Sequence, residues 1–193
     1  MKVMMLILFL LSISIASQGQ RTKRGEQRLI KSGQNFEKMR VVQVTDSLDF
    51  IILRNKSLDI PHLKRNIWDL LSERMLATVN DPNHAGVGIA APQVSVNRRL
   101  ILVQRFDKDD KPFETIFNPE IIYSSDSVHS RIEGCLSIPE IRDTVTRSWT
   151  IEVLYYNSKG KKIQETVEGF TARIFQHEID HLNGILFTDR IKH

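Results

Sequence analysis

The sequence predicts an α+β fold in a single domain, in which short antiparallel or mixed strands pack around a C-terminal helix, with another helix near the start of the domain. Two helical apolar stripes, over residues 61–79 and 170–182, flank a series of short β-type runs between residues 100 and 167. Helices that flank strands in this way are typical of α+β proteins, in contrast to alternating βαβ units. The length of 193 residues suits one sizeable core.

The first expected helix opens at Asp59-Ile60-Pro61, because proline is well tolerated in a first helical turn. It ends near residues 80–82, and its apolar stripe consists of Ile67, Leu70, Leu71, Met75, Leu76 and Val79. After a glycine-punctuated stretch at residues 86–94, the expected strands are residues 100–104, 115–117, 120–123, 144–146, 150–156 and 163–167. Residues 157–160 (Asn-Ser-Lys-Gly) join the last two as a hairpin turn. The final helix stops at Asn183-Gly184, since glycine adopts a left-handed conformation without strain.

The N-terminus is expected to lie outside this domain. Lys2 precedes an apolar run over residues 3–16, and polar residues follow, so residues 1–19 resemble a signal peptide and predict export. An uncleaved membrane anchor, a bipartite organellar signal and a misassigned start with a cytoplasmic protein are the alternatives. Residues 20–46 are predicted to be a basic, polar linker, which leaves residues 47–193 as the functional domain.

Composition excludes several classes of protein. The hydrophobic content of 41% and the charged content of 26% are those of a globular chain. The net charge is +4, and no Lys/Arg stretch alternates with aromatic residues, so we expect no nucleic-acid partner. Cys135 is the single cysteine, which rules out an intramolecular disulfide.

A cluster of metal-ligating residue types is the strongest functional signal. His177 and His181 lie four residues apart in the final helix, so both imidazoles can reach one cation. Glu178, between them, can engage a water without ligating the metal. Cys135, in a glycine-containing turn, would complete the three protein ligands that define a catalytic metal site. The alternatives are two ordinary surface histidines and an inert buried thiol.

Three segments in order resemble the motifs of the peptide deformylase family: GVGIAAPQ (86–93), EGCLS (133–137) and HEIDH (177–181). The similarity covers roughly residues 50–191. It implies a hydrolase that removes the formyl group from N-formyl-methionyl peptides and releases formate. It also implies one divalent metal ion per chain, typically ferrous iron, with zinc, nickel or cobalt as possible occupants. The implied ligands are Cys135, His177 and His181.

The resemblance also implies roles for other residues. Glu178 would be the general base and then the general acid, while Gln93 and the backbone N–H of Leu136 would form an oxyanion pocket. The substrate backbone would pair with Val87, Gly88 and Gly134. From motif proximity and the helix face, the methionine side chain is expected to contact Val87, Phe170 and Ile174. Asp180 is expected behind the ligands with Arg147 or Arg142 as its partner, unless it is a solvated surface acid.

The chain departs from the family pattern at Val94-Ser95, where Val-Gly is usual, and at Val145-Thr146-Arg147, where Val-Pro-Arg is usual. The export-like N-terminus also departs from it, because formylated chains are made inside cells or organelles. Outside the cytosol, oxidation of a ferrous–thiolate site would favour zinc. Two alternatives therefore remain open: a related metallohydrolase of another N-acyl amide, and a non-catalytic secreted binding protein. We expect a monomer that contacts membranes only through an uncleaved N-terminal segment.

Overall fold

The computed structural model describes residues 24–63, 66–83 and 85–191. The chain forms two compact units, Met1–Gln34 and Asn35–His193. In the first unit, residues 24–30 are helical, whereas the expected signal segment at residues 1–19 lies outside the described residues. Within the described ranges, no helix is both long and apolar enough to span a bilayer.

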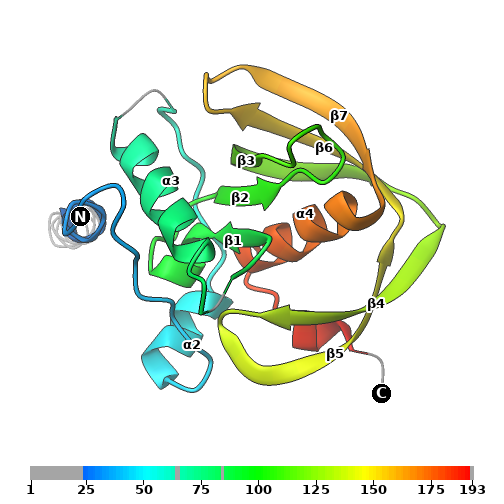
Figure 1. The fold of residues 1–193 in the computed structure, drawn as a ribbon, viewed down its shortest axis with the longest axis horizontal. Coiled ribbons are helices and arrows are strands. Elements are labelled where there is room, and N and C mark those ends of the chain that lie inside the picture. Colours follow the sequence, from blue (N-terminus) through cyan, green and yellow to red (C-terminus); the bar gives the residue numbers. More distant parts are fainter. Residues whose placement is uncertain (1–23, 64–65, 84, 192–193) are drawn as a thin grey trace, which may run out of the picture. The chain divides into compact units, whose positions relative to one another are not determined.

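The second unit contains two antiparallel sheets with helix α4 (Gly169–Leu182) between them (Figure 1). The larger sheet has the order β1-β2-β3-β6-β7, and β4 pairs with β5 in the smaller one. The strands are β1 (Gly88–Ala90), β2 (Leu100–Gln104), β3 (Phe113–Ser124), β4 (Val128–Cys135), β5 (Ile138–Ser148), β6 (Thr150–Asn157) and β7 (Lys162–Glu168). The other helices are α2 (Ser47–Arg54) and α3 (Asn66–Val79), with short 3-10 helices η1 (Ala91–Val94) and η2 (Phe187–Arg190).

Helix α4 is buried on two sides, which is why it can organise a site. Its apolar side chains pack on the larger sheet in one core cluster, with Ala172, Phe175, Ile179 and Leu182 against Ile101, Val103, Ile116 and Val153. A second cluster comprises Val42, Leu53, Ile138, Val145, Leu186 and Phe187, with Cys135 packed against it. Of the polar residues of α4, Glu178, Asp180 and His181 are therefore buried, at 4%, 6% and 1% exposure.

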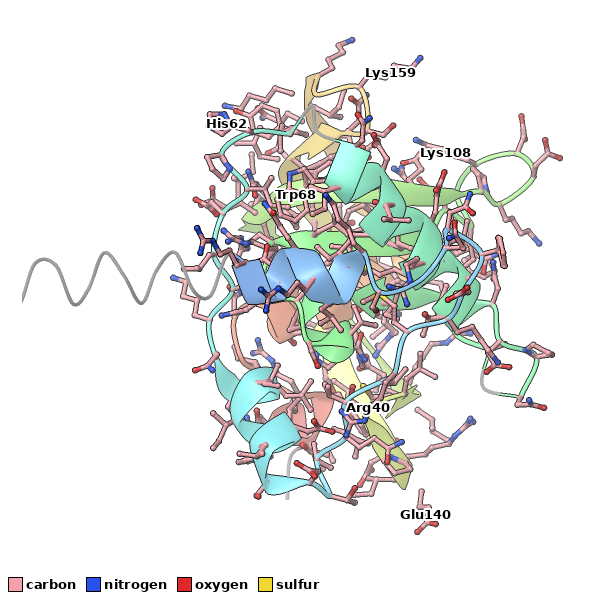
Figure 2. All side chains as sticks on the ribbon, turned by 90° about the vertical axis from the view of Figure 1, so that its left-hand side faces the viewer. Arg40, His62, Trp68, Lys108, Glu140 and Lys159 are labelled. Carbon is pink, nitrogen blue, oxygen red and sulfur yellow. The ribbon has the colours of Figure 1, made fainter. Side chains whose placement is uncertain are left out.

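The expected fold class and several expected elements are confirmed. Strand β2 has the expected bounds, and α4 ends where Gly184 takes a φ of +73°. A Cβ at Gly184 would lie 2.3 Å from the carbonyl oxygen of Arg54, so only glycine fits there. The expected hairpin turn joins β6 to β7, and Lys159 projects outward from it (Figure 2).

Other elements differ from the expectation. Helix α3 begins at Asn66 and not near Pro61, because Asn118 holds the backbone of Ile60 through two hydrogen bonds of 2.9 and 3.0 Å. The expected strands 115–117 and 120–123 form the single strand β3, with a register shift where Asn118 has a φ of +48°. Helix α2 was not expected; Asp46 caps it by accepting hydrogen bonds from the first-turn N–H groups.

The compact unit also starts before the expected boundary at residue 47. Met39 and Val42 are buried, at 6% and 0% exposure. The N–H of Val42 donates to the carbonyl of Gln93, and that of Val44 donates to the carbonyl of Ser137. Residues 35–46 therefore do not behave as a linker, because two apolar side chains and backbone hydrogen bonds attach them to the domain.

Candidate metal centre and active-site cleft

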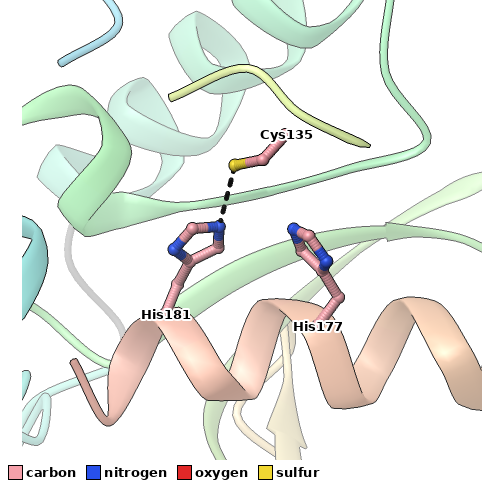
Figure 3. Close-up of side chains that lie close together, drawn as sticks. All are labelled: Cys135, His177 and His181. Atoms are coloured by element: carbon pink, nitrogen blue, oxygen red, sulfur yellow. Dashed lines mark hydrogen bonds between the residues drawn. The ribbon is translucent and has the colours of Figure 1, made fainter. Parts of the chain in front are cut away.

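Two elements bring the three predicted ligands together (Figure 3). Cys135 is the last residue of β4, while His177 and His181 lie one turn apart on α4. One ligand atom from each lies within 4.8 Å of the others, and Cys135 Sγ is 3.2 Å from Nε2 of His181. A thiolate with two imidazoles is a donor set that suits zinc or ferrous iron. The cluster could therefore hold a metal ion.

The charges around the cluster favour a cation. Burial lowers the pKa of His177, but hydrogen bonds to Cys135 and Glu133 outweigh burial and raise this pKa to about 10. Burial and the neighbouring His177 place the pKa of His181 well below its ordinary value, so that imidazole is neutral. A site that stabilises a proton on His177 would also stabilise a divalent ion that displaces this proton. The residues present thus fit the metal.

A buried carboxylate, Glu133, orients the first histidine. Its Oε2 lies 2.9 Å from Nδ1 of His177, which directs the other ring nitrogen of His177 toward the cluster. Arg147 donates to both oxygens of Glu133, at 2.7 and 2.9 Å, and Arg173 donates to Oε1. Burial raises the pKa of Glu133, yet His177 and Arg147 together hold it well below its ordinary value. Glu133 was not among the predicted site residues, although it lies within the EGCLS segment.

Asp180 forms the next layer of the same network. Arg147 donates to its Oδ2 at 2.8 Å, and Arg190 donates to its Oδ1 at 2.6 Å. Of the two predicted partners, Arg147 is therefore the one that pairs with Asp180. The other, Arg142, lies beside Gly134, where an added Cβ would meet its Cγ at 3.3 Å. At 6% exposure, Asp180 is also not a solvated surface acid.

Glu178 lines the cleft beside the cluster and is 4% exposed. Burial raises its pKa to about 7, although the charges of His177 and Arg147 act in the opposite direction. Its Oε2 is buried and has no hydrogen-bond partner among the described residues. A Cβ on Gly88 would lie 2.5 Å from the other oxygen, Oε1, so glycine is required for this close approach.

The side chain of Gln93 is fixed against the same cluster. Its Oε1 accepts from the N–H of Ala90 at 2.8 Å, which turns the amide nitrogen toward the thiol. That nitrogen lies 3.4 Å from Cys135 Sγ and 3.2 Å from the hydroxyl oxygen of Ser137. Leu136 follows Cys135 in the turn and lines the cleft. Both residues predicted for the oxyanion pocket are thus next to the ligands.

The cleft itself has a volume of about 990 Å³. Besides Cys135, His177 and Glu178, it is lined by every residue predicted to bind substrate: Val87, Gly88, Gly134, Phe170 and Ile174. Strand β1 is an edge of the larger sheet and pairs on one side with β2. An unpaired strand edge is suited to binding an extended peptide.

Fold and site together define an α+β protein with a candidate transition-metal centre between its C-terminal helix and a β-ribbon, next to a buried carboxylate. The chain belongs to the peptide deformylase family: a family model described as polypeptide deformylase matches residues 38–193. It is 41% identical over 140 residues to the peptide deformylase of Thermotoga petrophila, a match that covers 72% of this chain and 81% of that protein.

Solved structures agree with this assignment. The actinonin-bound class I type b peptide deformylase of Acinetobacter baumannii is 37% identical, with a TM-score of 0.71, over 81% of this chain and 99% of that one. The Met-Ala-Ser-bound form of that enzyme has a TM-score of 0.68 and 37% identity, over 80% and 98% of the two chains. The predicted family, fold class and hydrolase class are confirmed.

Proposed function

We propose that this chain removes the formyl group from N-formyl-methionyl peptides and so processes the N-termini of newly made proteins. The observation that carries this proposal is the buried, unpartnered oxygen of Glu178 beside Cys135, His177 and His181 in one cleft. The Acinetobacter baumannii relative with Met-Ala-Ser bound supports a peptide substrate whose first residue is methionine.

The chemistry follows from what each side chain can do. A divalent ion held by Cys135, His177 and His181 would act as a Lewis acid and make a water more acidic. Glu178 takes a proton from the attacking water on a carboxylate oxygen and later returns it to the departing amide nitrogen. Its burial suits both steps, because a carboxyl with a pKa raised to about 7 can accept and release a proton near neutral pH.

Gln93 and Leu136 stabilise the charge that grows on the formyl oxygen. The amide nitrogen of Gln93 already points toward Cys135, since Ala90 holds the other end of that side chain. Together with the backbone N–H of Leu136, it can donate to the oxyanion. Loss of one such donor typically lowers the rate by a factor of about 10²–10³.

The substrate backbone extends along the edge of β1 and contacts Val87, Gly88 and Gly134. The methionine side chain occupies the apolar end of the cleft, which we call the methionine slot and define by Val87, Phe170 and Ile174. The proposed occupant of the metal site is ferrous iron, with zinc, nickel and cobalt as substitutes, because thiolate and imidazole ligands suit all four ions. The domain is proposed to act as a monomer.

The test is formate release from formyl-Met-Ala-Ser by the metal-loaded chain, compared with the Glu178→Gln variant. We expect wild-type protein to release formate, and the variant to keep its metal while losing a factor of about 10²–10⁴ in kcat. Glu152→Gln is the matched control, because Glu152 is a half-buried residue of β6 that accepts a hydrogen bond from Gln164 and does not line the cleft. A Glu178→Gln variant with nearly wild-type rate would refute the proposed role.

Acetate release from acetyl-Met-Ala-Ser would identify the alternative hydrolase of another N-acyl amide. Metal-independent peptide binding without turnover would indicate a binding protein. Export through residues 1–19 is proposed separately. N-terminal sequencing of the mature protein from cell fractions tests it, and an intact N-terminus in the cytosolic fraction would refute it.

A further inference from the structure

The ring of Phe170 forms a wall of the methionine slot and is held by two residues from other elements. Phe170 is the second residue of α4 and is 36% exposed. The ring of Phe106 meets it edge-on, with centroids 5.1 Å apart and an interplanar angle of 63°. The guanidinium of Arg131 lies over it, 5.7 Å from the ring centroid. The described lining of the cleft includes Phe170 but neither of these two residues.

Phe106 is firmly placed, although it lies in a loop. The loop follows β2, where the N–H of Gln104 donates to the carbonyl of Val87 at 2.9 Å. Val87 forms another part of the slot, so the loop begins beside the slot backbone. The next residue, Arg105, is 1% exposed and pairs with Asp107 in the loop and with Glu165 on β7. Movement of Phe106 away from Phe170 would disturb these contacts.

Arg131 holds the ring from the opposite sheet. It lies on β4, four residues before the ligand Cys135, and its guanidinium reaches across to the start of α4. A guanidinium within about 6 Å of an aromatic centroid is attracted by the ring. The strand that supplies the thiolate therefore also holds the wall of the slot in place.

We propose that Phe106 and Arg131 are positioning residues that set side-chain specificity by fixing the ring of Phe170. The slot can reject a larger side chain only if the ring of Phe170 is held in place. A ring that is free to move would repack around the larger side chain and admit it. With both contacts present, the slot accepts the slender, unbranched methionine side chain and excludes bulky aromatic ones. This inference rests on the proposed function, since it concerns the residue that follows the formyl group.

The experiment compares kcat/KM for formyl-Met-Ala-Ser and formyl-Phe-Ala-Ser in wild-type, Phe106→Ala and Arg131→Met proteins. In Phe106→Ala, we expect the preference for methionine to fall about tenfold, because the ring of Phe170 can swing away and admit the larger side chain. Most of the change should be in KM, since the ligands and Glu178 are untouched. Arg131→Met should lower the preference about threefold, and Arg131→Lys should restore most of it.

Phe113→Ala is the matched control, because Phe113 begins β3 at the other end of the same loop, while the ring of Phe170 pairs with that of Phe106. The control should keep the wild-type preference. A merely structural role for Phe106 would lower thermal stability and the rates on both substrates together, without moving their ratio. A ratio within twofold of wild type in both folded, metal-loaded variants would overturn the proposal.

A binding measurement separates this inference from the proposed function. Titration calorimetry of the metal-loaded proteins with Met-Ala-Ser and Phe-Ala-Ser should show the same loss of preference in Phe106→Ala. If wild-type protein releases no formate, the proposed function fails, and the ratio of the two affinities still decides the inference. If Phe106→Ala does not fold, Phe106→Leu keeps the apolar volume and removes the edge-on ring contact, with the same expected direction.

Discussion

The second unit contains two networks of ion pairs that are built from the same residue types but differ in burial. The helix network, around the ligands, contains Glu133, Asp180, Arg147, Arg173 and Arg190. The loop network, at the base of the β2–β3 loop, contains Arg105, Lys108, Asp107, Glu114 and Glu165. In the side-chain view, Lys108 of the loop network lies in the upper part, and Glu140, one of the cleft-lining residues, lies at the bottom (Figure 2).

The networks differ in how deeply both partners are buried. In the helix network, the side chains of Arg147 and Glu133 are 4% and 6% exposed. In the loop network, Arg105 is 1% exposed, but its carboxylate partners remain 25–33% exposed. Full burial makes an ion pair rigid and also makes the loss of one partner costly. Loss of a partner from the Glu133–Arg147 pair should therefore lower the free energy of unfolding more than a comparable loss in the loop network. The carboxylates of the loop network are partly exposed and can be hydrated by water.

The largest effect is expected from Glu133→Gln, which leaves Arg147 and Arg173 buried with one fewer charged partner. The free energy of unfolding should fall by about 3–5 kcal/mol. Metal affinity should fall about 10- to 100-fold, because His177 loses the carboxylate that orients it. Urea unfolding and chelator competition measure the two changes, with Glu152→Gln as control. Unchanged metal affinity would contradict the role given to Glu133.

A smaller loss is expected from Arg105→Met, which removes the centre of the loop network. Asp107, Glu114 and Glu165 are each partly exposed and can be hydrated when the guanidinium is gone. The free energy of unfolding should fall by about 1–3 kcal/mol, with metal affinity unchanged. The same two assays apply. A loss as large as that of Glu133→Gln would remove the contrast between the networks.

Acid pH should remove the contribution of the loop network to stability. The hydrogen bond from Arg105 lowers the pKa of Asp107, and Arg105 and Tyr155 outweigh burial to lower that of Glu165. Lowered folded-state pKa values stabilise the fold above the ordinary carboxyl pKa of about 4, and this stability is lost as pH falls through the folded-state values. Wild-type protein should therefore lose more stability than Arg105→Met between pH 7 and 3. Parallel urea curves at both pH values test this, and equal losses would refute it.

The smallest effect is expected from Arg190→Ala. The side chain of Arg190 is 46% exposed, and Asp180 keeps its buried partner Arg147 after the substitution. The change in the free energy of unfolding should be at most about 1 kcal/mol, since partly exposed ion pairs contribute little. Thermal unfolding at low and high salt measures it. A loss comparable to that of Glu133→Gln would show that the helix network depends on its exposed end.

Local patterns in the sequence correctly predicted those elements whose conformation is set by residues close to one another in the chain. The bounds of β2 and the stop of α4 at Gly184 follow from short-range preferences, and the structure confirms them. Helix α2 and the start of the unit at residue 35 were not predicted. The apolar residues of α2 are mostly consecutive, over Phe50–Leu53, and such a short run does not distinguish a helix from a strand. Residues 39–44 are held by contact with distant segments such as Gln93 and Ser137.

The residues of the candidate site also fall into two groups: those that the sequence predicted and those that only the structure identified. His177, Glu178 and His181 share one helix, and Cys135 is the single thiol, so sequence alone identified the donor atoms. Glu133 and His177 are 44 residues apart, so their pairing could not be predicted from the sequence around either residue. The choice of Arg147 over Arg142 beside Asp180 is likewise decided by where β5 passes α4.

The residue types that can bind a metal and move a proton were determined by the sequence alone, because that chemistry belongs to individual side chains. Only the packing of α4 between two sheets decided which charges lie beside those side chains and how far water is excluded from them. The reason is physical: burial and ion pairing depend on atoms that come together only when segments far apart in the chain are folded.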